Sequence, residues 1–359
     1  MMLSTRFKVE NGQLDRGNSS GPTGSPTIWF YVPQEDFAVA QSPDGSTEFL
    51  QRPSCHWTLL TYLRLKRHIG HCRLTSVLPT AGLLIAHRIS VPFKYRPPTG
   101  LLFICICGDA TPHPYAHIQV VQNPAQITSV RNSFQIPFWP QRDVIPRELG
   151  RGDKFENIDY FGVPEHLSPE LHSPEWLDFL ANLGCRWRLR EFHEWNDYST
   201  TDVVAAVRSF DGDPCIHKPA SKLLNAWRGE VPAVLGPESA YQVLRRSESD
   251  FLEVRSFAEL KSTMLTLSRD SELRRRMREN GRRRSAEVTA ESITKRWEMF
   301  ISAVAIPKYE EINRSGRLRH LSFVTHSYLR VRRAGLIHRL RNLKKGKWQV
   351  AIRISSRNR

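Results

Sequence analysis

Long hydrophobic runs are missing from this chain of 359 residues. The longest apolar run, residues 101–107, is far shorter than the roughly 18 residues that a membrane-spanning helix needs, so an integral membrane protein is not expected. The N-terminal residues contain no apolar segment of the kind found in secretory signal peptides, which favours a cytoplasmic protein.

Cysteine is scarce as well. Six cysteines are spread over the whole chain, and their spacing matches neither a disulfide framework nor a zinc-binding pattern. Cys105 and Cys107 lie in the longest apolar run, where both would face the same side of a strand. We expect them to be buried free thiols, and no metal site is predicted from cysteine.

Acidic residues are absent from the C-terminal part. Residues 313–359 contain fourteen Lys and Arg and no Asp or Glu, out of a net charge of +16, so residues 1–312 carry only +2. A strongly basic chain suggests nucleic acid as a partner. Here the basic character belongs to a C-terminal extension, and the nearly neutral body needs a separate explanation.

The remaining composition is that of an ordinary globular protein of about two domains, with 40% hydrophobic and 25% charged residues. Residues 1–26 are rich in Ser, Gly, Asn and Pro and are predicted to be a flexible leader. A first series of short apolar strands and one helix follows. The strands are predicted at 27–32, 72–78, 83–87, 101–107 and 117–122, and the helix at 56–69.

A stretch dense in Pro and Arg, residues 137–153, separates this series from a second one. Strands are predicted at 155–162, 202–207, 232–235 and 251–254, and helices at 174–183, 219–228, 257–267, 271–288 and 290–305, the last ending before Pro307. Two such series predict an α/β fold with two parallel-sheet domains, residues 27–150 and 151–312, facing each other across a cleft.

One helix start in the second series carries a chemical signal. A buried strand ends at Arg208, and Pro219 is typical of the first turn of a helix, so we expect that helix to begin near Lys218. The unpaired N–H groups and positive dipole end of a helix attract anions. Lys218, Ser221 and Lys222 add two cations and a hydroxyl, which predicts a phosphate or diphosphate site.

Further polar residues are expected at the same edge of the sheet. Asn225 falls on the same helix face as Ser221, and the strand at 232–235 leads to Glu238 and Ser239. Because ligands bind at the carboxyl ends of parallel strands, Asn225, Glu238 and Ser239 are predicted to contact ribose or sugar hydroxyls.

Each of these signals has a structural alternative. The helix could pack on its sheet with both lysines in solvent. Arg208 could pair with a structural carboxylate such as Asp202 or Asp213, and Glu238 could be a simple turn residue. Trp227 is expected in the core.

Residues 218–236, KPASKLLNAWRGEVPAVLG, resemble the donor-nucleotide segment of GT-B glycosyltransferases. They are similar to the KP..KLLEAMA.G.PVV stretch of retaining family 4 enzymes and to the EK..NA...G.VPVV.G stretch of α1,3-fucosyltransferases. The similarity extends over residues 202–309. It implies two Rossmann-like domains in a GT-B-like arrangement, with a nucleotide-sugar held by residues 151–312, the acceptor held by residues 27–150, and no resident cofactor or metal.

The chain departs from these families at the acidic positions. Asn225 stands where family 4 enzymes have Glu, His217 stands at the position of its partner Glu, and Ser221 replaces the Glu of the fucosyltransferase motif. The paired carboxylates are therefore absent, which leaves the donor, the acceptor and the stereochemical outcome open. The alternative to a glycosyltransferase is a catalytically degenerate scaffold of the same fold, or a nucleic-acid- or membrane-binding protein that acts through its basic C-terminal tail.

Candidate catalytic residues in the first series are Asp109 and His113, which follow a buried strand and are placed to act as general base. A structural role is the alternative for His113. Asp211 and Asp213 form one Asp-x-Asp, which resembles a metal motif of other glycosyltransferases. A plain acidic turn is the favoured interpretation, and no metal is predicted.

The basic extension, residues 313–359, has leucines near helical spacing with arginines between them. This pattern is typical of helices that lie on an anionic membrane surface, which we favour as its partner. Nucleic acid is less favoured because no base-reading motif appears, and a disordered tail is the other alternative. The sequence thus predicts a cytoplasmic protein with peripheral membrane association.

Overall fold

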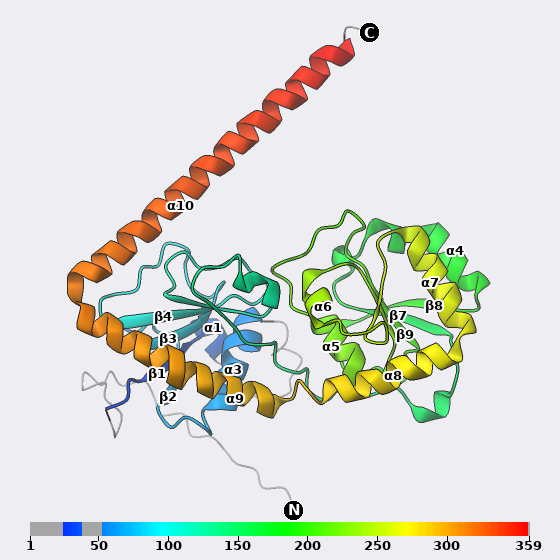
Figure 1. Cartoon of the computed structure of the whole chain (residues 1–359), viewed down its shortest axis with the longest axis horizontal. Coiled ribbons are helices and arrows are strands. Elements are labelled where there is room, and N and C mark those ends of the chain that lie inside the picture. The colour runs from blue at the N-terminus through cyan, green and yellow to red at the C-terminus, as the bar shows by residue number, and fades with distance from the viewer. Residues whose placement is uncertain (1–23, 38–51, 358–359) are drawn as a thin grey trace, which may run out of the picture.

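The computed structural model describes residues 24–37 and 52–357, and two parallel β-sheets organise it (Figure 1). Most of the leader expected at residues 1–26 therefore lies outside the described residues. The α/β fold with two parallel-sheet units and a helical C-terminal extension is confirmed.

The first sheet has six strands in the order β2-β1-β3-β4-β5-β6, and every neighbouring pair is parallel. β3 and β4 are buried along their whole length because apolar side chains cover both faces, as expected for central strands of a parallel sheet. The strands are β1 (Ile28–Tyr31), β2 (Cys72–Thr75), β3 (Gly82–His87), β4 (Leu101–Ile106), β5 (Ile118–Val121) and β6 (Ser133–Gln135).

Two helices that lie far apart in the sequence cover one face of this sheet. A π turn at Cys55–Leu59 leads into α3 (Leu60–Leu65), and α9 (Ala290–Phe300) packs beside α3. Ile293, Trp297 and Phe300 of α9 belong to the same core as Ile28 and Phe30 of β1. The first lobe is thus built from two stretches of chain, since α9 returns to it after the second lobe. The short helix α1 (Gln34–Phe37) follows β1.

The second sheet has five parallel strands in the order β11-β10-β9-β7-β8. The strands are β7 (Asn157–Phe161), β8 (Arg186–Arg190), β9 (Val203–Ala206), β10 (Ala233–Leu235) and β11 (Leu252–Glu253). The helices of this lobe are α4 (Pro174–Asn182), α5 (Ser221–Arg228), α6 (Ser239–Leu244), α7 (Phe257–Arg269) and α8 (Ser271–Ser285).

Buried polar contacts fix α5 against α8. Trp227 lies in the core, as expected, and its indole N–H donates to the carbonyl of Asp250. The guanidinium of Arg284 lies 4.5 Å from the centre of the Trp227 ring and pairs with the Asp250 carboxylate at 2.8 Å. A Cβ on Gly281 would approach the Trp227 backbone to 3.2 Å, so a glycine permits this close packing. These contacts hold the helix whose start faces the candidate site.

The expectation that a helix ends before Pro307 is wrong. A π turn at Ile301–Ala305 follows α9 and leads directly into α10 (Ile306–Arg357). Pro307 therefore lies inside a continuous helix, where it has no N–H to donate to the preceding turn, and the π turn directly before it is where the helical hydrogen-bond pattern shifts. The backbone leaves helical geometry at Gly316, and beyond this bend α10 projects from the first lobe (Figure 1). Within the described ranges, no helix is both long and apolar enough to cross a bilayer.

Candidate functional site

A cavity of about 280 Å³ lies between the two sheets. Its lining includes Asp109, which follows β4 of the first sheet, and Gly162 and Arg208, which follow β7 and β9 of the second. The carboxyl ends of strands from both lobes therefore meet at this cavity, which is where parallel sheets bind ligands.

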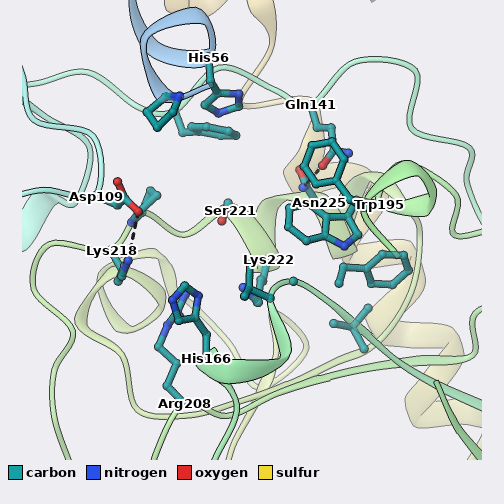
Figure 2. Close-up of a pocket in the computed structure, with 18 of the residues that line it drawn as sticks. His56, Asp109, Gln141, His166, Trp195, Arg208, Lys218, Ser221, Lys222 and Asn225 are labelled. Atoms are coloured by element: carbon teal, nitrogen blue, oxygen red, sulfur yellow. Dashed lines mark hydrogen bonds and ion pairs between the residues drawn. The ribbon is translucent and has the colours of Figure 1, made fainter. Parts of the chain in front are cut away.

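The start of α5 forms one wall. α5 begins at Ser221, three residues after the start that we expected near Lys218. Pro219 lies before the N-cap residue Ala220 and is not part of the first helical turn. Alanine has no side-chain oxygen to cap the first N–H groups, so they are left for another acceptor. Lys218, Ser221 and Lys222 all line the cavity (Figure 2). The structure therefore places two lysines, a hydroxyl and the positive end of a helix dipole at one wall.

Arg208 adds a third cation and is held by an acid behind it. Its Nε lies 3.1 Å from Oε1 of Glu238, whose side chain is almost fully buried. Arg208 therefore does pair with a structural carboxylate, but that carboxylate is Glu238 and not Asp202 or Asp213. Asp202 instead pairs with Arg147 and Arg151 at the other end of the strand.

Lys222 is the most strongly perturbed cation of the site. Its Nζ lies 5.2 Å from the centre of the Tyr160 ring, and a Cβ on Gly162 would come within 3.1 Å of that nitrogen. Burial, followed by repulsion from Arg208, lowers the pKa of Lys222 to about 7. An incoming anion would favour the charged form of Lys222 and so offset both effects, which makes this lysine suited to bind negative charge.

Asp109 lines the cavity from the first lobe and contacts Lys218 of the second lobe. Its carboxylate accepts a hydrogen bond from Lys218 Nζ at 3.1 Å (Figure 2). Burial alone would raise the pKa of Asp109, but the charge and hydrogen bond of Lys218 outweigh it and lower that pKa. Gly108 sets this position, since its φ is +60° and a Cβ there would come within 2.7 Å of His87.

The other end of the cavity is aromatic. The rings of Phe192 and Trp195 lie 4.7 Å apart, and Phe161 stacks on Tyr198 at 4.0 Å. Asn225 lies beside Trp195, and its amide donates to Gln141 of the first lobe (Figure 2). Among the described residues, no group donates a hydrogen bond to the buried Oδ1 of Asn225. This end therefore offers flat apolar faces and a free amide acceptor.

Two histidines at the cavity were not among the expected site residues. His56 precedes Trp57 in the first lobe, and burial lowers its pKa to about 4 even though Asp109 raises it. His166 follows β7, and its pKa is lowered by burial and then by Arg208. His56 lies in a segment that reads as an ordinary amphipathic helix, so its sequence pattern gives no sign of a site.

Three of the proposed site residues do not line the cavity. His113 is buried, with one ring nitrogen 3.1 Å from the Pro92 carbonyl and the other accepting from the Tyr115 N–H. Glu238 lies behind Arg208. Ser239 accepts a hydrogen bond at 2.9 Å from the Asn123 amide, which links the lobes beside the cavity.

The Asp-x-Asp forms a turn. Asp211 accepts a hydrogen bond from the backbone N–H of Asp213, and Asp213 accepts one from the N–H of Cys215, as in Asx turns. Over the described part of the chain, no three His, Cys, Asp or Glu side chains are grouped to hold a metal ion.

Comparisons with known proteins give only distant likenesses. No family model matches the sequence, and no curated protein matches it. Among solved structures, the chain is similar to TarM at 10% identity and a TM-score of 0.45, with 68% of this chain covered and 58% of TarM spanned. It is similar to HepE from Anabaena in complex with UDP and glucose at 13% identity and a TM-score of 0.49, covering 77% of this chain and all of HepE. It is also similar to AviGT4, a glycosyltransferase of avilamycin A biosynthesis, at 14% identity and a TM-score of 0.46, covering 81% of this chain and 99% of AviGT4.

Proposed function

We propose that this protein is a glycosyltransferase that moves a sugar from a nucleotide-sugar to an acceptor. The observation that carries the proposal is the cavity itself, which joins three cations and a helix start at one end to a group of aromatic rings at the other. A nucleoside diphosphate has the matching shape, with an anionic diphosphate joined to a flat base.

The cations and the possible bases of the cavity would have different roles. Arg208, Lys218 and Lys222 would hold the diphosphate, and their charge would stabilise it as the bond to the sugar breaks. The new bond forms between that sugar carbon and an acceptor oxygen, whose proton passes to a base. Asp109 and His56 face the cavity from the first lobe and are the candidate bases. Binding of the diphosphate would take Lys218 from Asp109 and release the carboxylate for that role.

A nucleotide screen tests the proposal. UDP, GDP and their sugars at millimolar concentration are added to the full chain, and melting temperature and donor hydrolysis are measured. We expect one nucleotide to raise the melting temperature, because a ligand that binds only the folded form stabilises it. A flat response to every nucleotide and sugar contradicts the proposal.

The affinity for that nucleotide should fall as the pH rises above about 7. The pKa of Lys222 is about 7 in the empty site because burial and then Arg208 disfavour its charge, so above this pH the lysine must take up a proton to bind the diphosphate. The loss approaches tenfold per pH unit by linkage. Titration calorimetry in buffers of different ionisation enthalpy measures both affinity and proton uptake. An affinity that rises over this range contradicts the assignment.

The second candidate function is a nucleotide-binding scaffold without transfer. It is favoured by the absence of acidic residues at positions 217, 221 and 225 and by the contact that ties Asn225 to Gln141. Nucleotide binding with no donor hydrolysis and no transfer to any acceptor would select this candidate over the first.

We also propose that residues 313–359 hold the protein at an anionic membrane surface. Leu318, Leu321, Leu329 and Leu336 are exposed along the projecting part of α10, with arginines between them. Apolar side chains enter the bilayer interface while cations meet lipid headgroups, each cation contributing about 1 kcal/mol.

Truncation after residue 336 tests this membrane proposal. It removes eight of the fourteen basic residues and leaves Phe323 stacked on His117 of the first lobe, so the fold should persist. Binding to phosphatidylglycerol vesicles should fall at least a hundredfold at about 1 kcal/mol per cation, while hydrolysis of a soluble donor stays within about twofold. Vesicle binding equal to that of the full chain would contradict the proposal.

A further inference from the structure

A second cavity, of about 270 Å³, lies at the other edge of the first sheet. His117 lines it just before β5, and Arg131 and Asn132 line it just before β6. These are the N-terminal ends of strands whose carboxyl ends point toward the candidate site. The second cavity is therefore separate from the nucleotide site proposed above.

The bend in α10 builds this cavity. Lys308 and Ile312 line it from before the bend, and Arg319 and Phe323 line it from after the bend. Gly316 has φ 70° and ψ −177°, a backbone geometry that favours glycine and turns the two helical halves toward one space. A straight helix would place these residues on separate turns along one rod.

The lining has an excess of positive charge. Arg131, Lys308 and Arg319 are cations, and Glu311 is the one acid among the lining residues. The Glu311 carboxylate lies 2.8 Å from Lys308 Nζ and 3.7 Å from the guanidinium of Arg319, so it offsets only part of this charge. The charge of this cavity therefore fits an anionic group.

A fixed neutral donor lies among these cations. Nδ1 of His117 accepts the Phe103 N–H at 3.0 Å, so the ring carries its proton on Nε2. The ring stacks on Phe323 with centroids 4.2 Å apart, and burial lowers the pKa of His117 to about 3. The imidazole is thus held rigidly as an N–H donor at neutral pH.

The surface beside the cavity indicates where its anion comes from. Leu318 and Leu321 follow the bend and are 83% and 59% exposed. A second copy of this chain would meet its own basic helix and be repelled, and a nucleic acid would leave these leucines in water. An anionic bilayer satisfies both the cations and the leucines.

We propose that this cavity binds the phosphate of an anionic membrane lipid through Arg131, Lys308 and Arg319, with Leu318 and Leu321 inserted beside it. The inference rests on the membrane association proposed above and adds a defined headgroup site to it. It places the first lobe, and not only the projecting helix, against the membrane.

Vesicle co-sedimentation of the full chain tests this proposal. Phosphatidylcholine vesicles carry either phosphatidic acid or phosphatidylglycerol at matched surface charge. The cavity variant is Arg131→Gln with Lys308→Gln, and the matched control is Arg317→Gln with Arg333→Gln, two exposed α10 arginines outside the cavity. General electrostatics lowers binding equally in both variants. A headgroup site lowers it roughly tenfold further in the cavity variant alone, most strongly on phosphatidic acid.

Equal loss in the two variants would overturn the headgroup site and leave the membrane association intact. Absence of vesicle binding by the parent chain would overturn both. Glycerol 3-phosphate in solution tests whether the cavity binds a soluble phosphate and not a lipid headgroup. If it raises the melting temperature of the parent but not of the cavity variant, while vesicles do not bind, the site takes a soluble phosphate and the lipid assignment is wrong.

Discussion

Replacing Lys222 with methionine should lower the affinity for the nucleoside diphosphate roughly ten- to a hundredfold, because a charge-assisted hydrogen bond contributes about 1.5–3 kcal/mol. The empty protein should be at least as stable as the parent. Lys222 lies beside Arg208 and Lys218 without a ligand, and burial already lowers its pKa, so removing its charge relieves an unfavourable state. Methionine keeps the packing on Tyr160, because its thioether sits well against aromatic rings.

Calorimetry and thermal melting on the same samples separate these two effects. Lys261→Met is the matched control, since Lys261 pairs with Glu175 and neither residue lines the cavity. It should change neither affinity nor transfer rate. If the Lys222→Met variant binds the nucleotide as tightly as the parent, the start of α5 does not bind the diphosphate.

Glu238→Gln is expected to have the largest effect on stability. The carboxylate is almost fully buried and pairs with Arg208, so its loss leaves a buried guanidinium without its counter-charge. Breaking such a pair costs about 3 kcal/mol, which lowers the melting temperature of a lobe of this size by about 6–12 °C. The nucleotide should recover much of this loss, because its diphosphate would replace the missing negative charge beside Arg208.

Asp202→Asn separates this rescue from general destabilisation. Asp202 is also buried and pairs with Arg147 and Arg151, but it lies outside the cavity lining. The variant should melt earlier, and its nucleotide-induced shift should match the parent's. If Glu238→Gln shows no larger shift than Asp202→Asn, Arg208 does not meet the diphosphate.

The central elements of the fold could be predicted because apolar periodicity reports burial directly. β3, β4 and β9 are apolar along their length, and each was expected within a residue or two. β8 was missed because its sequence, RWRLR, is charged. It is an edge strand, and Arg188 pairs with Asp159 of β7 at 2.6 Å. The return of α9 was missed because an apolar helix face does not specify which sheet it covers.

The cationic side of the cavity could also be predicted, because its residues lie near a strand end and a helix start in the sequence itself: Arg208, Lys218, Ser221 and Lys222. The aromatic end of the cavity could not be predicted from the sequence. Trp195 comes from a loop after β8, and its approach to Asn225 depends on tertiary packing. Catalytic roles for Asp109 and the other site residues remain predictions, and the variants above test the diphosphate wall.

The return of α9 to the first sheet has a consequence for synthesis of the chain on the ribosome. The second lobe's strands and helices form one continuous stretch, from β7 to α8, and can fold as soon as they emerge. The first lobe, although made earlier, must wait for Trp297 and Phe300 to cover the apolar face of β1 and β3. Nascent chains that stall before residue 290 should therefore expose that face and recruit chaperones.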